Sequence, residues 1–426
     1  MLKNGFWTLI YRVLGAALTL GSTILFARLL GALEFGLLNL GLTTITIVCL
    51  IVRSGLDNVA LKQVSAHFPE QRGIVDSYIA VILRVVLSLG ILFTVLVYVM
   101  ADIIAIELFS KPKFEEVLKI FSFLIIPMSL SYVLSEINKA LGRPMFSAFG
   151  HGVLPISITL TLVWFVSVTS DNELSKILLA IIAGFLVSVI TYLYSIRAYI
   201  VSRSKCYLTS LSVLKEGIPM LLVSSGALVM AWSDIMILGI YSSADNIGIY
   251  SAASRLVMAT TIILIAVNAV TVPKYAKYYK TGDIAAIEKL ARAAAVVLLL
   301  VVSIPMMILM FFSDWIMLLL GEEFSGGEQV LRVLAIGQFV NVICGSVAYL
   351  LIMTGKEEVL RNIYFVTAIL NIFLSIILLK IWGVIGVAYA TSFSVIMWNI
   401  LAAYIVKKHL GFWSFRPGSL MELKGL

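Results

Sequence analysis

The chain has 426 residues and a formal net charge of +8, with 61% hydrophobic and only 13% charged residues. A soluble protein of this length carries about twice that charged fraction. The apolar residues fall in runs of about 20, the length of helix that crosses roughly 30 Å of hydrocarbon. A membrane barrel would show alternating segments of about 10 residues instead. The composition therefore excludes a soluble fold and predicts an all-α polytopic membrane protein.

Twelve apolar runs are long enough to be transmembrane helices. The first is expected to remain as a span rather than to be a cleaved signal peptide, because Arg12 interrupts it and a second run follows at once. The expected spans are 6–30, 35–55, 78–100, 117–140, 146–168, 174–197, 217–241, 247–272, 292–313, 329–353, 361–380 and 384–406.

Lysine and arginine gather in alternate loops, and this bias predicts the orientation of the chain. One set of loops holds basic clusters, as in 197–215 and 274–292, whereas the opposite loops hold few, among them Lys111 and Lys380. Basic loops stay in the cytoplasm, so both termini are expected on the cytoplasmic side. The same rule accounts for the net charge of +8, and no nucleic-acid partner is expected.

The chain contains an internal repeat. Residues 2–36 align without a gap with residues 214–248, an offset of 212 (214 − 2). Residues 115–120 align with 328–333 at an offset of 213 (328 − 115). We therefore expect two lobes of six helices, 1–205 and 206–426. An even number of spans per lobe makes the two repeats parallel, and transporters built in this way bind substrate between their halves.

Charged residues inside spans are the strongest indication of a site, because arginine at mid-membrane costs on the order of 2.5–3.5 kcal/mol on the insertion scale. Arg12, Arg84 and Arg255 each lie about two turns into an expected span, and Asp234 lies in the outer half of the seventh. All four are candidates to line a substrate-binding cavity. The alternatives are snorkelling to the membrane surface or a salt bridge between helices, for which Asp234 and Arg255 are candidate partners.

Other charged residues lie near the ends of spans, where the insertion cost is small. Arg28 fits an anchor at the outer surface or a position at the outer mouth of the cavity. Asp57 and Lys62 fit an inner mouth, or they simply cap the second span. Five asparagines are expected to form hydrogen bonds between helices: Asn39, Asn268, Asn341, Asn371 and Asn399.

Patterns of catalytic residues are missing from the sequence. His67, His151 and His409 are far apart, and there is no GxSxG, Walker A, HExxH or CxxC motif. Cys49, Cys206 and Cys344 have no metal-binding spacing. We therefore expect a protein that is not an enzyme, with no metal site and no ATP-driven step. The candidate arginines within the expected spans outnumber the candidate acids, of which there is one, Asp234. This excess of positive charge favours an anionic substrate such as a phosphate ester.

Several segments resemble one transporter family. The sequence ARLLGALEFGLLNL (27–40), followed by RSGLDNVALKQVSAHF (53–68), resembles the opening of Wzx-type O-antigen flippases, in the polysaccharide-transporter branch of the MOP superfamily. NIGIYSAASRL (246–256) resembles the start of that family's eighth span, and LLLGEEFSGGEQVLRVLAIG (318–337) resembles its connection between spans nine and ten. Within these motifs, Arg28 and Arg255 match arginines that are common in the family.

The resemblance implies twelve helices in two lobes around a V-shaped, MATE-like cavity. It implies alternating access that moves undecaprenyl-diphosphate-linked oligosaccharide from the cytoplasmic to the outer leaflet of a bacterial inner membrane. Coupling to H+ or Na+ is implied, as are membrane lipids, a polysaccharide polymerase and a chain-length regulator as partners. Two alternatives remain at this point: a MATE-type ion-coupled drug or cation antiporter, and a membrane-embedded glycan polymerase or ligase.

Overall fold

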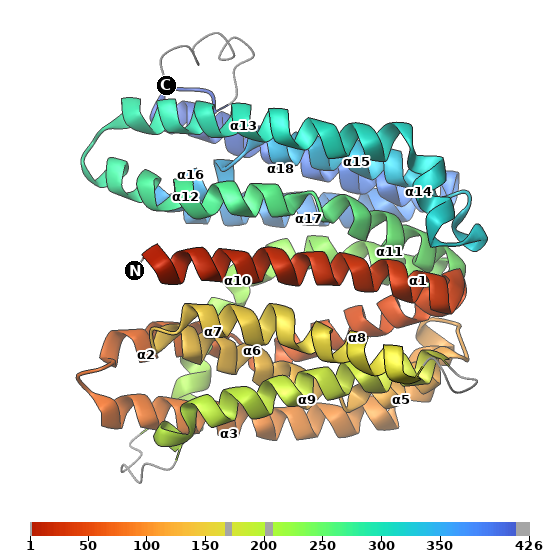
Figure 1. The fold of residues 1–426 in the computed structure, drawn as a ribbon, viewed down its shortest axis with the longest axis horizontal. Coiled ribbons are helices and arrows are strands. Elements are labelled where there is room, and N and C mark those ends of the chain that lie inside the picture. The colour runs from red at the N-terminus through yellow and green to blue at the C-terminus, as the bar shows by residue number, and fades with distance from the viewer. Residues whose placement is uncertain (1, 167–172, 201–207, 415–426) are drawn as a thin grey trace. The chain divides into compact units, whose positions relative to one another are not determined.

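The computed structural model describes residues 2–166, 173–200 and 208–414, which form helices joined by short turns with no strand among them (Figure 1). By their contacts the residues divide into two compact units. The first unit is Met1–Ser225 with Gly239–Ala244, and the second is Gly226–Leu238 with Asp245–Leu426. The expected all-α class is confirmed.

The first unit is built on long helices that run roughly along one direction, connected by shorter helical pieces. Its elements are α1 (Leu2–Arg53), α2 (Leu56–His67), α3 (Arg72–Val99), α4 (Ala101–Ile103), the π-helical turn η1 (Ile104–Leu108), α5 (Phe114–Ser122), α6 (Ile125–Ala140), α7 (Pro144–Ala148), the π-helical turn η2 (Phe149–Val153), α8 (Leu154–Val166) and α9 (Glu173–Ile200). Helix α10 (Ser210–Tyr241) contributes residues to both units.

The second unit repeats this plan of long helices and short connecting pieces. Its elements are α11 (Ala244–Met258), α12 (Thr261–Lys280), α13 (Ile284–Phe311), α14 (Ser313–Leu320), the 3₁₀ turn η3 (Glu322–Phe324), α15 (Glu328–Cys344), α16 (Val347–Met353), α17 (Glu357–Trp382) and α18 (Val384–Leu410). Helix α18 packs against both α15 and α17.

The first two expected spans, 6–30 and 35–55, lie in the single element α1, which is broken at Gly31. A straight helix of its 52 residues would be about 78 Å long, more than twice the roughly 30 Å hydrocarbon core. Gly31 has φ 66° and ψ 178°, which is not helical. Glycine tolerates a positive φ because it has no Cβ. The chain therefore turns at Gly31, and the two halves of α1 are separate spans.

Eight described helices are long and apolar enough to cross a membrane, and ten if each of two bent helix pairs counts as one span. Those eight count α1 once, although its two halves match two expected spans. The expected seventh span lies in α10, of which Leu228–Tyr241 is a shorter apolar helix. Each of the twelve expected segments is thus mostly helical where it is described, with short breaks such as the one at Gly345 and Ser346 between α15 and α16. Helices α3 and α13 begin earlier than expected, at Arg72 and Ile284, because a helix continues past the apolar run that hydropathy detects.

The repeat is visible in irregular features of both units. Helices α5 and α6 form a pair bent by 50°, and α15 and α16 form a pair bent by 40°. These pairs begin at Phe114 and Glu328, 214 residues apart (328 − 114). The short helices α4 and α14 precede them and begin at Ala101 and Ser313, 212 residues apart (313 − 101). A shared bend at a shared offset supports the parallel repeat more directly than apolar similarity does.

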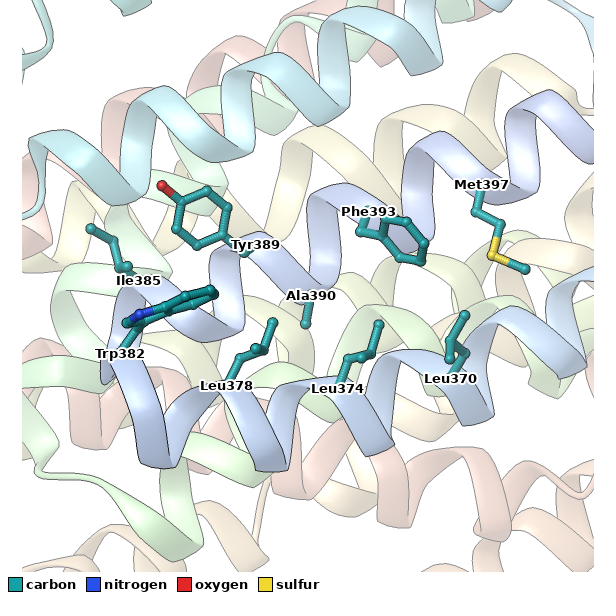
Figure 2. Close-up of a pocket in the computed structure, with 9 residues that line it drawn as sticks. All are labelled: Leu370, Leu374, Leu378, Trp382, Ile385, Tyr389, Ala390, Phe393 and Met397. Carbon is teal, nitrogen blue, oxygen red and sulfur yellow. The ribbon is translucent and has the colours of Figure 1, made fainter.

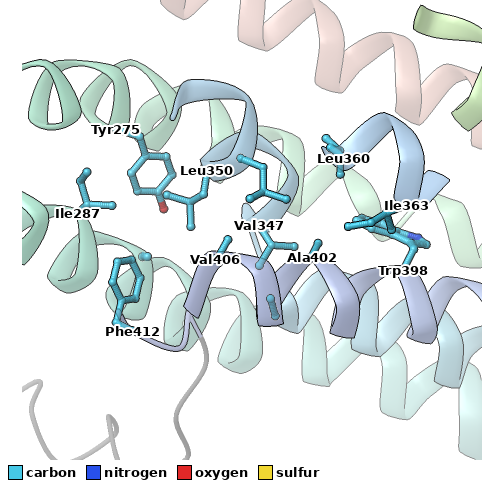
Figure 3. Packing of buried hydrophobic residues seen from close by; sticks show 13 residues of the cluster. Tyr275, Ile287, Val347, Leu350, Leu360, Ile363, Trp398, Ala402, Val406 and Phe412 are labelled. Atoms are coloured by element: carbon cyan, nitrogen blue, oxygen red, sulfur yellow. The ribbon is translucent and has the colours of Figure 1, made fainter. Parts of the chain in front are cut away.

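Buried apolar side chains of α12, α13, α16, α17 and α18 pack together in a core of the second unit (Figure 3). Val347 and Leu350 of α16 pack beside Ala402 and Val406 of α18, and Trp398 lies 5.0 Å from the ring of Tyr364 between centroids. Lipid tails are as apolar as these side chains, so close van der Waals packing rather than water exclusion holds such helices together.

Most of the expected asparagine contacts between helices are confirmed. Asn399 donates to Asn341 at 3.0 Å, Ser346 donates to Asn268, and Asn371 donates to Asp234 at 2.9 Å. Asn39 is the exception, because its side-chain amide donates to the carbonyl of Phe35 in its own helix.

Candidate functional site

Asp234 of α10 lies at the centre of a buried polar cluster in the second unit and is 5% exposed. Its Oδ2 accepts a hydrogen bond of 2.6 Å from the phenol of Tyr250, and its Oδ1 accepts one of 2.9 Å from the amide of Asn371. The hydroxyl of Thr391 lies 2.8 Å from the same Oδ2. These four residues, called the Asp234 cluster, come from α10, α11, α17 and α18.

The donors of the Asp234 cluster do not satisfy all of its oxygen atoms. Thr391 has one hydroxyl hydrogen, yet it lies within hydrogen-bond distance of both Asp234 Oδ2 and the carbonyl oxygen of Val387, the latter at 2.9 Å. Asn371 Oδ1 is buried without a hydrogen-bond partner in the described part of the chain, and so is Ser375 Oγ one turn further along α17. The site therefore has unused acceptor oxygens beside a carboxylate.

This chemistry suits a proton or a small hard cation. A carboxylate in the membrane interior is costly unless a positive charge or a proton compensates it. The groups within hydrogen-bond distance of Asp234 are neutral: a phenol, an amide and a hydroxyl. Oxygen donors of this kind bind cations such as Na+ or Ca²⁺ rather than soft transition metals. No group of three or more His, Cys, Asp or Glu residues that could hold a metal ion occurs among the described residues.

Arg255 does not pair with Asp234, so the salt bridge considered from the sequence is wrong. Among the described residues the polar partners of Asp234 are Tyr250, Asn371 and Thr391. Tyr250 and Arg255 are five positions apart on α11, which puts them about 140° apart around the helix. Tyr250 therefore reaches Asp234 while the partly buried Arg255 points elsewhere.

A second polar cluster lies in the first unit around Arg53, which is 6% exposed at the end of α1. Arg53 donates to Asp57 at 2.8 Å across one helical turn, and its guanidinium lies over the ring of Tyr132 at 4.2 Å from the centroid. The ring of His151 meets that of Tyr132 edge-on at 4.4 Å. We call these four residues the Arg53 cluster. Asp57 thus holds an arginine in place and also lies in the first turn of α2.

His151 lies in the π-helical turn η2 between α7 and α8. Its Nδ1 is buried and has no hydrogen-bond partner in the described part of the chain. Single π-helical turns inside α-helices are frequently found at functional sites. The backbone of α1 approaches this turn so closely that a Cβ on Gly15 would lie 2.8 Å from the carbonyl oxygen of Gly152.

The remaining charged residues expected at a site lie on the surface of the first unit. Arg12, Arg28, Arg84 and Lys62 are exposed. Arg12 and Arg84 form no ion pair with any described residue. Their charges are thus available to a molecule outside the unit.

The structure adds buried charges that the sequence analysis did not single out. Arg53 lies at the end of the expected span 35–55, where a flanking basic residue is ordinary, although its spacing of four from Asp57 is the signal for a helical ion pair. Asp76 of α3 is 3% exposed, and its Oδ1 has no hydrogen-bond partner in the described residues. It lies in the extension of α3 that precedes the expected span, so hydropathy did not mark it. Asp76 is therefore a second buried acid in a candidate membrane span, in addition to Asp234.

The protein-family comparison identifies the chain as a transporter. The family described as Polysaccharide biosynthesis protein matches residues 1–279. The chain belongs to this family. A second family, MatE, matches residues 218–377. These are families of membrane transporters, so the expectation that the protein is not an enzyme is confirmed and the glycan polymerase or ligase alternative is not supported.

Two curated relatives carry names that concern glycans. The chain is 24% identical over 244 residues to a protein of Haloferax volcanii named as a low-salt glycan biosynthesis flippase, Agl15, covering 56% of this chain and 51% of the relative. It is 24% identical over 248 residues to a protein of Shigella dysenteriae named as an O-antigen transporter, covering 56% and 61%. The match thus spans about half the length of these relatives.

Solved structures with the same fold cover nearly the whole chain. The lipid II flippase MurJ in an inward closed conformation superposes with a TM-score of 0.76 at 18% identity, covering 96% of this chain and 88% of that one. An inward-facing multidrug resistance MATE family transporter of the MOP superfamily gives 0.77 at 14% identity, covering 96% and 98%. At these identities the likeness shows the fold, and the expected MATE-like architecture is confirmed.

Proposed function

We propose that this protein moves an oligosaccharide linked to undecaprenyl diphosphate from the cytoplasmic to the outer leaflet of a bacterial inner membrane. Membership of a lipid-linked glycan flippase family supports the class of reaction. The excess of arginine in the spans is the observation that supports an anionic substrate. Arg12, Arg53, Arg84 and Arg255 lie in helices expected to cross the membrane. A diphosphate is the part of such a substrate that arginine recognises best.

The two units have separate roles in the proposed cycle. Arg12 and Arg84, exposed on the first unit, attract the diphosphate from the cytoplasmic side, and Arg255 of the second unit contacts it on the exit half. The Arg53 cluster keeps one further cation fixed through its ion pair with Asp57. Alternating access between lobes 1–205 and 206–426 then carries the head group across. Arg28, Asp57 and Lys62 lie at the mouths of this path.

We place the coupling site for the driving ion at the Asp234 cluster. The carboxylate and the unused oxygens of Asn371 and Ser375 form the ligand set for Na+ or the acceptor for H+. A cation bound there neutralises a buried charge in the second unit, and it favours whichever conformation holds the ligands together. Coupling of this kind needs no nucleotide.

Reconstitution tests the proposed function. Purified protein is placed in vesicles that contain a fluorescent undecaprenyl-diphosphate oligosaccharide, and a membrane-impermeant quencher reports the fraction in the outer leaflet. We expect the protected fraction to become accessible when the protein is present and a Na+ or H+ gradient is imposed. An accessible fraction equal to that of protein-free vesicles would reject the proposal. In cells, loss of the protein should leave the lipid-linked glycan on the cytoplasmic leaflet.

The second candidate function is a MATE-type ion-coupled antiporter of drugs or organic cations. The MatE match over residues 218–377 and the structural likeness to a multidrug transporter favour it. The arginine excess argues against it, because a site for cations needs carboxylates facing the substrate. Efflux of a cationic dye from the same vesicles, with no movement of the glycan, would select this alternative.

A further inference from the structure

Two nitrogen atoms of the Arg53 cluster reach the accessible surface of the first unit without a hydrogen-bond partner. Arg53 donates from Nη1 to Asp57 at 2.8 Å and from Nε to the carbonyl oxygen of Cys49 at 3.2 Å. Its Nη2 donates to no described residue and is not among the buried unpaired atoms of the described chain, so it is accessible. The same holds for Nε2 of His151. The cluster therefore presents two free nitrogen atoms on a largely buried support.

The buried nitrogen of His151 determines what the accessible one can do. Nδ1 is buried and has no hydrogen-bond partner among the described residues. An uncharged imidazole carries its proton on one of the two nitrogens, and a charged one carries a proton on both. A buried N–H without an acceptor is rarer than a buried acceptor without a donor, so we assign the proton of the uncharged ring to Nε2. In either form, His151 presents an N–H donor at the surface.

The two free donors are neighbours of one tyrosine ring. The guanidinium carbon of Arg53 lies 4.2 Å from the centroid of the Tyr132 ring, and the imidazole centroid of His151 lies 4.4 Å from it. One diphosphate is therefore large enough to contact both donors. The positive charge of Arg12, in the first half of α1, also acts on the imidazole. Asp57 brings a carboxylate to this cluster, but Arg53 already binds it.

Close backbone contacts fix the position of His151, which stands between two glycines in η2. A Cβ on Gly150 would lie 2.6 Å from the ring of Tyr192 in α9. On the other side, Gly152 lies against Gly15 of α1. The turn is thus held between two helices, and its donor is in place before a ligand arrives. Such preorganisation reduces the entropy that is lost on binding.

We propose that His151 binds the diphosphate of the lipid-linked substrate, donating from Nε2 beside the free Nη2 of Arg53. This inference rests on the proposed function. A site that offers N–H donors fits an oxyanion, because phosphate oxygens accept charge-assisted hydrogen bonds from such groups. Arg53 and Arg12 supply positive charge, and His151 adds a directed donor. A cation would need a free acceptor oxygen, whereas the carboxylate of Asp57 is occupied.

The apolar groove between α17 and α18 in the second unit is a poor place for the phosphate. This groove has a volume of about 920 Å³ (Figure 2). Its lining consists of leucine, isoleucine, alanine, methionine and aromatic side chains, with no charged group. A diphosphate there would lose its hydration without a compensating charge, which is costly. The donors of the Arg53 cluster match the head group better.

Two amide substitutions separate the roles of the two imidazole nitrogens. The amide of asparagine lies near the position of Nδ1, whereas the amide of glutamine extends about as far as Nε2 and carries N–H donors. Native mass spectrometry of the purified full chain measures the binding of undecaprenyl diphosphate to the parent, to His151→Asn and to His151→Gln. Undecaprenol, which has the same tail without phosphate, is the second probe. The matched control is His409→Asn, an exposed position at the end of α18.

We expect His151→Asn to bind undecaprenyl diphosphate about tenfold more weakly than the parent, because it loses a hydrogen bond to a charged group. His151→Gln and His409→Asn should bind it like the parent. Undecaprenol should bind all four proteins alike. Parental affinity of His151→Asn for the diphosphate would overturn the inference. A loss that is equal in His151→Gln, or that extends to undecaprenol, would show that His151 only supports the fold and would overturn it as well.

Phosphatidylglycerol, as a third probe, distinguishes the substrate from an ordinary phospholipid. Its affinity should be the same for the parent and for His151→Asn. A tenfold loss for phosphatidylglycerol as well would assign the site to the phosphate of membrane lipids and overturn the proposed ligand.

The vesicle assay separates this inference from the proposed function. Glycan translocation by the parent, together with parental diphosphate affinity in His151→Asn, would retain the flippase function and reject His151 as a binding residue. A diphosphate affinity that depends on His151, in a protein that moves no glycan, would retain the site and reject the flippase function.

Discussion

Tyr250 donates a hydrogen bond of 2.6 Å to Asp234, and both side chains are buried where α11 meets α10. The phenol reaches the carboxylate from a helix that also carries Arg255, yet it is the neutral donor and not the arginine that contacts the acid. Neutral donors leave the negative charge of a buried carboxylate uncompensated. This relationship supports the proposal that an exchangeable cation, rather than a fixed one, compensates the buried charge of Asp234.

The first prediction concerns the charge of Asp234. Asp234→Asn keeps the size of the side chain but removes the negative charge that a cation or proton would compensate. We expect the variant to fold but to lose at least about 90% of its glycan translocation rate, which corresponds to roughly 1.4 kcal/mol of activation free energy. The remaining translocation should no longer depend on a Na+ or H+ gradient. Asp245→Asn, an exposed acid at the start of α11, is the matched control. Gradient-dependent translocation at the parental rate in Asp234→Asn would contradict the assignment.

The second prediction concerns the phenol of Tyr250. Tyr250→Phe leaves the ring in place but removes a donor to a buried carboxylate, which costs about 1–3 kcal/mol for a charged acceptor. Thermal unfolding in detergent should therefore occur at a lower temperature than for the parent. Tyr404→Phe, on α18 and 54% exposed, should unfold like the parent. If the two variants are equally stable, the hydrogen bond contributes nothing to the folded state.

The sequence predicted the helical class and the repeat, and it singled out Asp234 as a candidate site residue, because each of these depends on local pattern. Apolar runs, loop charges and a constant offset are all properties of consecutive residues. The partners of Asp234 could not be predicted, because Asn371 and Thr391 are more than 130 residues away and hydrogen-bond specificity depends on how helices rotate about their axes. Asn371 was expected to form a contact between helices, but nothing in its neighbourhood identified the acceptor.

Arg53 and His151 were missed for different physical reasons. Arg53 follows an apolar run, so it has the sequence signature of an ordinary cytoplasmic flanking charge, and its burial depends on Tyr132 from a distant helix. His151 lies inside the expected span 146–168, and nothing in the sequence marks the π-helical turn in which it stands. The Nδ1 atom of His151 is buried there, which hydropathy does not detect.

The third prediction concerns the ion pair between Arg53 and Asp57. Its side chains are 8% and 19% exposed, so removing one partner leaves a largely desolvated charge and costs about 3 kcal/mol. We expect Arg53→Gln to destabilise the protein by that amount, and the double variant Arg53→Gln with Asp57→Asn to recover more than half of it. Chemical denaturation of each variant gives the free energies of unfolding.

The exposed pair of Lys119 and Glu115 is the control for this cycle. It has the same spacing of four residues, but its side chains are 41% and 33% exposed. Its double-mutant cycle should give a much smaller coupling than that of Arg53 and Asp57, because solvent screens an exposed pair. Similar coupling energies for the two pairs would mean that Arg53 is solvated and that the Arg53 cluster is not a buried site.

The last prediction concerns the contact between Gly55 and Gly217 in the first unit. Gly55 has φ 75° in the turn between α1 and α2, and a Cβ there would collide with the carbonyl oxygen of Gly217 in α10. Gly55→Ala therefore has two costs, the left-handed backbone conformation and the displacement of a helix. Gly142→Ala is the control, because Gly142 has φ 77° but no atom within 4 Å of the added methyl. We expect Gly142→Ala to lower the free energy of unfolding by about 1–2 kcal/mol, and Gly55→Ala to lower it clearly more. Gly55→Ala should also abolish transport, because α10 carries Asp234. Equal losses of stability for the two substitutions would show that α10 can shift near Gly217 without an energetic cost. The close backbone contact would then not fix the position of α10 in the first unit.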